Sequence, residues 1–143
     1  MTRAGGRVIS KEFDGGAAVF HPVDPVLTLK VLTGTAQALV HEAGPSRFDN
    51  FIGRKMHGMF VQAGFSAVST RTYAVQMHAP LTPAMKRYIR SSAEWYGRMA
   101  LPYLSVHEQD GWAHAFDPDS DACVLDRPDF YFSEIETVTE GTV

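Results

Sequence analysis

The sequence predicts an α/β fold with about three strands and about four helices, and three observations support this. Apolar residues recur at helical spacing in four segments, most of which start at a recognisable cap. Three other segments are rich in Val, Thr, Tyr and Phe, as strands are. The 143 residues are 45% hydrophobic and 20% charged, which is enough apolar material for one core.

The first predicted strand covers residues 8–13. A Gly5-Gly6 turn precedes it, and Gly15-Gly16 closes it as a second turn. The first predicted helix begins at Asp24-Pro25, because an acceptor at the N-cap and a proline at the first helical position favour a helix start. Gly44-Pro45 is expected to stop this helix.

A second helix is predicted over residues 51–63, with Gly64 as its left-handed cap, followed by a strand over residues 65–77. Two further helices fill residues 82–116. Ser105 and Glu108 form the capping box of the last of these helices.

The last predicted strand covers residues 130–138, with a bulge near Ser133 where the apolar phase shifts. An acidic turn precedes it, in which Asp117, Asp119 and Asp121 alternate as in a calcium loop. The glycine and the distal glutamate of such a loop are missing, and the six histidines have no ligand spacing. No metal site is therefore predicted.

Composition excludes several classes of partner. The net charge is −3 and no basic cluster stands out, which argues against nucleic acid. No apolar run approaches the length of a membrane span, and the N-terminus lacks a signal peptide, which argues against a membrane. The single cysteine, Cys123, excludes an internal disulfide, so a reducing cytoplasm is expected.

Three segments carry a resemblance to a known family. They are Arg3-Ala4-Gly5-Gly6-Arg7-Val8-Ile9, Phe60-Val61-Gln62-Ala63-Gly64-Phe65-Ser66-Ala67-Val68 and Asp126-Arg127-Pro128-Asp129-Phe130-Tyr131-Phe132-Ser133-Glu134. In this order the chain resembles the C-terminal half of class I S-adenosylmethionine-dependent methyltransferases. The resemblance implies a partial Rossmann-like fold whose last strand is antiparallel. Residues 1–143 would then be a single partial domain, with a helical insert at about 82–116.

The resemblance leaves the cofactor site incomplete. The family binds S-adenosylmethionine with a Gly-rich loop after its first strand, and this chain has no Gly-x-Gly-x-Gly segment after a strand. Met1 is therefore expected to be an internal methionine of a longer protein. The cofactor would bind only if preceding residues complete the site, and the chain alone is expected to be inactive.

The resemblance and the rule for open α/β sheets together point to acceptor-binding residues. Ligands lie beyond the carboxyl ends of parallel strands, where Glu12, Phe13 and Asp14 are predicted, with Phe20 and His21 in the following loop. Glu12 or His21 would take a proton from the methyl acceptor, and Phe13, Asp14 and Phe20 would contact it. Alternatively, Glu12 is an ordinary charge at the end of a strand, and His21 only packs within the loop.

Two pairs outside this strand complete the predicted site. Arg54 and His57 share a helix face and would contact a polar group of the acceptor, unless they form a solvated surface. Trp95 and Tyr96 lie in the insert and suit a flat or apolar acceptor, unless they pack in the core.

The leading functional hypothesis is therefore the acceptor-substrate side of a methyltransferase acting on a small molecule. A stand-alone binding or dimerisation module, forming a homo-oligomer through an exposed sheet edge, is the alternative. A third hypothesis is a small α+β isomerase with a carboxylate or histidine base in a closed pocket.

Overall fold

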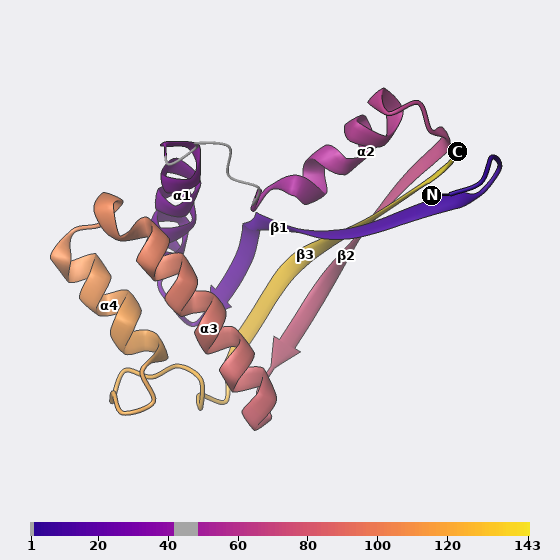
Figure 1. The fold of residues 1–143 in the computed structure, drawn as a ribbon. Helices are drawn as coiled ribbons and strands as arrows, with labels where there is room; N and C mark the ends of the chain where they lie inside the picture. The colour runs from indigo at the N-terminus through magenta and orange to yellow at the C-terminus, as the bar shows by residue number, and fades with distance from the viewer. Residues whose placement is uncertain (1, 42–48) are drawn as a thin grey trace. The chain divides into compact units, whose positions relative to one another are not determined.

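The computed structural model describes residues 2–41 and 49–143 (Figure 1). Within these residues the fold is mixed α/β, with three strands, four α-helices and a short 3₁₀ helix, which confirms the predicted element types. In chain order the elements are β1 (Arg7–His21), α1 (Pro25–His41), α2 (Ile52–Gln62), β2 (Ser66–His78), α3 (Pro83–Ala100), η1 (Leu101–Tyr103), α4 (Val106–Phe116) and β3 (Tyr131–Thr142). The predicted helix stop at Gly44-Pro45 lies outside the described residues.

The three strands form one antiparallel sheet in the order β1-β3-β2, with the last strand of the chain in the middle (Figure 1). The N–H of Gly5 donates to the carbonyl of Val143, and the N–H of Ala79 donates to the carbonyl of Phe130. The start of β1 and the end of β2 thus lie beside opposite ends of β3. Both edge strands therefore run in the same direction, and β3 is antiparallel to each.

The chain divides into two compact units. The described residues of unit 1 are 2–17, 49–75 and 134–143, and those of unit 2 are 18–41 and 76–133. Each strand contributes one part to each unit. Unit 1 therefore contains α2, and unit 2 contains α1, α3, η1 and α4.

The prediction that Gly15-Gly16 closes the first strand is wrong, because β1 continues through both glycines to His21. The N–H of Gly15 donates to the carbonyl of Asn50 at 2.8 Å. A Cβ at residue 15 would lie 2.0 Å from Nδ2 of Asn50. Because Gly15 has no side chain, Asn50 can approach the backbone of β1 closely.

This longer strand changes the position of five predicted site residues. Glu12, Phe13 and Asp14 lie within β1 and not at its carboxyl end, and Phe20 lies in the strand and not in a loop. His21 is the last residue of β1. The carboxyl end of β1 is therefore occupied by His21, and not by Glu12, Phe13 and Asp14 as predicted.

In unit 1, helix α2 covers the sheet with Met56 and Phe60, which are both buried. The rings of Phe60 and Phe65 stack with centroids 4.8 Å apart. Gly64, with φ of 82°, ends the helix in the left-handed conformation as predicted.

The core of unit 2 is built around Phe20, which is 2% exposed. Its ring lies edge-on to Trp112 and Phe116, with centroid separations of 5.3 and 5.4 Å. The ring centroid of Phe132, in β3, lies 5.0 Å from that of Phe20. Helices α1 and α3 pack together, and the α-carbon of Gly34 lies against Ala100.

The predicted caps of unit 2 are confirmed. Thr82 caps α3, and Ser105 forms the complete capping box with Glu108 at the start of α4. Phe132 and Ser133 of β3 are both buried, so the burial pattern changes phase where the sequence predicts it.

Candidate functional site

An ion pair between β1 and α2 joins two of the predicted site residues in unit 1. Nε and Nη2 of Arg54 donate to the two carboxylate oxygens of Asp14 at 2.5 and 2.6 Å. The Asp14 side chain is only 10% exposed, whereas the Arg54 side chain is 56% exposed. The pair therefore presents a positioned guanidinium to solvent above a buried carboxylate.

The surroundings of Asp14 hold its carboxyl group in the ionised form. Burial raises its pKa, but the hydrogen bonds from Arg54 and from the N–H of Gly16 outweigh burial, so the pKa lies below its ordinary value. The Gly16 N–H donates to Oδ1 at 3.0 Å. Asp14 is therefore suited to orienting Arg54 and not to donating a proton near neutral pH.

Asn50 lies beside this pair and was not predicted from the sequence. The residue is 1% exposed, and neither Nδ2 nor Oδ1 of its side chain has a hydrogen-bond partner among the described residues. Its backbone carbonyl accepts the Gly15 N–H. Because a buried amide without partners is costly, Asn50 is a polar position that packing alone does not explain.

The other predicted residues of unit 1 do not converge on this ion pair. Nδ1 of His57 lies 3.1 Å from the hydroxyl of Thr70, which in turn lies 3.1 Å from the hydroxyl of the buried Thr139. Glu12 accepts a hydrogen bond from Ser10 at 3.1 Å. Phe13 is half-buried, and its carbonyl lies close to Gly53.

The predicted residues of unit 2 serve mainly as core. Phe20 and Tyr96 are buried, and Trp95 is half-buried against the same cluster. The His21 side chain is 58% exposed, with Nε2 3.9 Å from the Asp129 carboxylate. A closed apolar pocket around His21, as the isomerase hypothesis requires, is not compatible with this exposure.

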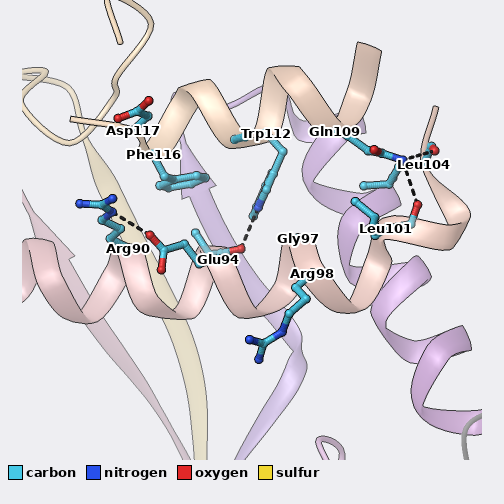
Figure 2. Close-up of a pocket in the computed structure, with 12 residues that line it drawn as sticks. Arg90, Glu94, Gly97, Arg98, Leu101, Leu104, Gln109, Trp112, Phe116 and Asp117 are labelled. Atoms are coloured by element: carbon cyan, nitrogen blue, oxygen red, sulfur yellow. Dashed lines mark hydrogen bonds and ion pairs between the residues drawn. The ribbon is translucent and has the colours of Figure 1, made fainter. Parts of the chain in front are cut away.

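Unit 2 has a concave groove between α3 and α4 (Figure 2). It has a volume of about 310 Å³, and its apolar walls are formed by Ala93, Gly97, Leu101, Leu104, Trp112 and Phe116. Trp112 and Phe116 extend from α4 toward α3. We call this hollow the α3–α4 groove.

The α3–α4 groove could not be predicted from the sequence. Its residues come from α3, η1, α4 and the positions next to them. Apolar residues at helical spacing on these helices predict a buried face as readily as a groove. The sequence gives only a weak indication that Asn50 has a special role. Asp49 and Asn50 stand just before a predicted helix, where such residues favour an N-cap.

Among the residues that the structure describes, no group of three His, Cys, Asp or Glu side chains could hold a metal ion. In that same part of the chain, no helix has the length and apolarity to cross a membrane.

Neither the protein-family models nor the curated proteins compared with this chain match it. The geometry and the sequence resemblance therefore carry the functional argument.

Proposed function

We propose that this chain is the C-terminal portion of a class I S-adenosylmethionine-dependent methyltransferase, with a partial Rossmann-like fold, and forms the acceptor side of its site. The observation that carries the proposal is the strand arrangement. β1 and β2 run in one direction and the last strand, β3, runs against both, which the resemblance implies for the end of such a domain. The helices between the strands also follow the expected order.

Within this proposal, Arg54 binds the acceptor, which is a small molecule, and Asp14 positions Arg54. The exposed guanidinium retains N–H groups that do not face Asp14, and these suit a carboxylate, carbonyl or other polar oxygen. The buried carboxylate fixes the direction of the guanidinium. Their contribution is positioning, which brings reacting groups together at low entropic cost.

The residues of this chain do not fit a complete S-adenosylmethionine site. Gly15 and Gly16 are engaged within β1 by Asn50 and Asp14, so they do not form a loop that opens onto a helix. Preceding residues would have to supply the cofactor loop. The proposal therefore assigns no chemical step to this chain beyond holding the acceptor.

The test begins with the reading frame upstream of Met1. The longest in-frame protein would be expressed and its melting temperature measured with and without S-adenosylmethionine and S-adenosylhomocysteine. Stabilisation by both is the expected result, with none for residues 1–143 alone. An early upstream stop codon, or an extended protein that binds neither compound, would contradict the proposal.

A second set of measurements tests the role of the ion pair. In the extended protein, Arg54→Met should leave cofactor-dependent stabilisation unchanged and raise KM for the acceptor. Lys55→Met, on the same helix, is the matched control, because Lys55 pairs with Asp49 and not with Asp14. An equal effect of both variants would show that Arg54 has no specific role.

A stand-alone binding or dimerisation module is the second candidate, favoured by the two edge strands, β1 and β2. Self-association of residues 1–143 without any response to the cofactor would favour it. In either case we place the protein in the cytoplasm, because its single cysteine, Cys123, suits a reducing compartment.

A further inference from the structure

Helix α1 is apolar on the side that faces away from the core of unit 2. Val31 lies in that core and is fully buried, whereas Val26, Leu29 and Val40 are 59%, 63% and 69% exposed. Lys30 is the one Lys, Arg, Asp or Glu among the 17 residues of this helix. A helix face in contact with water normally carries charged and polar side chains. The outer face of α1 therefore has the composition of a contact surface.

The exposed apolar residues of α1 belong to one continuous stripe. It consists of Val26, Leu29, Thr33, Ala36 and Val40, which follow one another in alternating steps of three and four residues. Residues at these steps lie along one side of a helix and form the seam by which two helices pack together. Thr33, at the centre, is exposed, and Ala36 is half-buried. We call these five residues the α1 stripe.

The surroundings of the α1 stripe are suited to the approach of a second helix. The ammonium group of Lys30 donates to the carboxylate of Glu108, so the one charge of the outer face is already compensated. A hollow of about 350 Å³ lies beside the stripe, and Thr33, Gln37 and Tyr103 are among its lining residues. A helix placed on the stripe would therefore bury no unpaired charge and would find space for its side chains.

We propose that the α1 stripe packs against the α1 stripe of a second copy of this chain, antiparallel and with a two-fold axis beside Thr33. Two crossing helices are closest at the crossing point and diverge from it. The small side chains of Thr33 and Ala36 suit the crossing point. Val26 of one copy and Val40 of the other then fill the widening gap on either side. The stripe is thus complementary to itself, as a two-fold contact requires.

The charges also favour an antiparallel pair of copies. A parallel pair would set Lys30 against Lys30 of the second copy, and like charges that meet in an interface are unfavourable. The antiparallel pair places Lys30 beside Gln37 of the second copy instead. The proposal requires only residues of unit 2, so it rests neither on the methyltransferase assignment nor on pairing between sheet edges.

Sedimentation equilibrium over a range of protein concentrations tests this contact. Residues 1–143 should form a dimer that dissociates on dilution. Leu29→Glu should raise the dissociation constant by about tenfold, because the dimer would bury an unpaired carboxylate. Met59→Glu is the matched control, since Met59 is an exposed apolar residue of α2. Both substitutions are made together with Ile9→Lys, because exposed Ile9 on the edge strand β1 would offer a second contact. Circular dichroism verifies that the variants are folded.

Disulfide cross-linking locates the two-fold axis. Thr33→Cys should form a disulfide-linked dimer under mild oxidation, because the two copies of residue 33 lie closest to each other in the proposed contact. Ser91→Cys, at an exposed position of α3, is the control and should cross-link far less. Both variants also carry Cys123→Ser, so that only the introduced thiol reacts.

Three outcomes would overturn the proposal. A chain that stays monomeric at every concentration, or equal effects of Leu29→Glu and Met59→Glu, would show that the α1 stripe is not the contact. Equal cross-linking of the two cysteine variants would show random collision. In a monomeric extended protein, a Thr33→Cys thiol protected from a thiol reagent would show that other residues of the same chain cover the stripe. None of these outcomes alters the response to S-adenosylmethionine, so the two proposals fail separately.

Discussion

At the scale of single residues, Gly15 shows how one missing Cβ permits the contact between β1 and Asn50. Gly15→Ala would place Cβ 2.0 Å from Nδ2 of an amide that is itself buried. We expect the free energy of unfolding to fall by about 1–3 kcal/mol, as overpacked sites typically show. Urea unfolding followed by circular dichroism measures this change.

Gly58 provides the matched control for that substitution. It lies within α2, and a Cβ there would have no neighbour within 4 Å. Gly58→Ala should therefore raise the free energy of unfolding by about 0.5–1 kcal/mol, because alanine restricts the unfolded chain. Similar destabilisation by both variants would refute the close approach at Gly15.

The Asp14–Arg54 ion pair predicts a pH dependence of stability with a definite sign. The pKa of Asp14 is lower in the folded protein than its ordinary value of 3.8. The pair therefore stabilises the fold above about pH 4, and this contribution is lost as the pH falls through the folded-state pKa. The difference in unfolding free energy between the original protein and Asp14→Asn should shrink as the pH falls below about 4.

Arg54 supplies the control for that pH dependence. If the guanidinium lowers the pKa of Asp14, Arg54→Gln should diminish the same pH dependence, and adding Asp14→Asn should have little further effect. Additive effects of the two substitutions would show that the residues act independently.

These residue-scale features were only partly predictable from the sequence. Gly64 was predicted correctly because a helix stop is a local signal. Gly15-Gly16 was misassigned because a glycine pair fits both a turn and a close approach, and Asn50 is distant in the sequence. Asp14 and Arg54 were proposed separately, but their pairing depends on how α2 packs on β1 in unit 1.

At the scale of elements, the capping box of α4 contributes a measurable part of the stability of unit 2. The Ser105 hydroxyl accepts the Glu108 N–H at 3.4 Å, and the Glu108 carboxylate accepts the Ser105 N–H at 2.8 Å. Lys30 also donates to Glu108, and these hydrogen bonds together lower its pKa to about 2. The capping box thus keeps its charged acceptor under acidic conditions.

Ser105→Ala should lower the free energy of unfolding by about 1 kcal/mol, since it removes the side-chain cap. Ser91→Ala, at an exposed position inside α3, should be neutral or slightly stabilising because alanine favours helix interiors. Thermal unfolding at matched concentrations compares the two. A larger loss from Ser91→Ala would mean that the cap contributes little.

The helix starts were predicted well because each is decided by a few adjacent residues, as at Thr82 and Ser105. Strand β1 was predicted too short because glycines are rare in strand interiors and its pairing with β3 is a long-range contact.

At the scale of the whole molecule, element types followed from local patterns, but the sheet order did not. No feature of the β3 sequence predicts that this strand lies between β1 and β2. That order leaves two edge strands, each of which can pair with another chain.

The edge of β1 therefore predicts concentration-dependent association. Ile9 of β1 is 61% exposed, and an apolar side chain on an edge strand favours pairing between chains. We expect the average mass from light scattering to rise with concentration, and Ile9→Lys to reduce this rise because like charges would meet when two edges approach. Met59→Lys adds the same charge at an exposed position of α2 and should change the association much less. A strictly constant mass, or equal effects of both lysines, would show that the β1 edge is not the contact and would remove the main support for the dimerisation alternative.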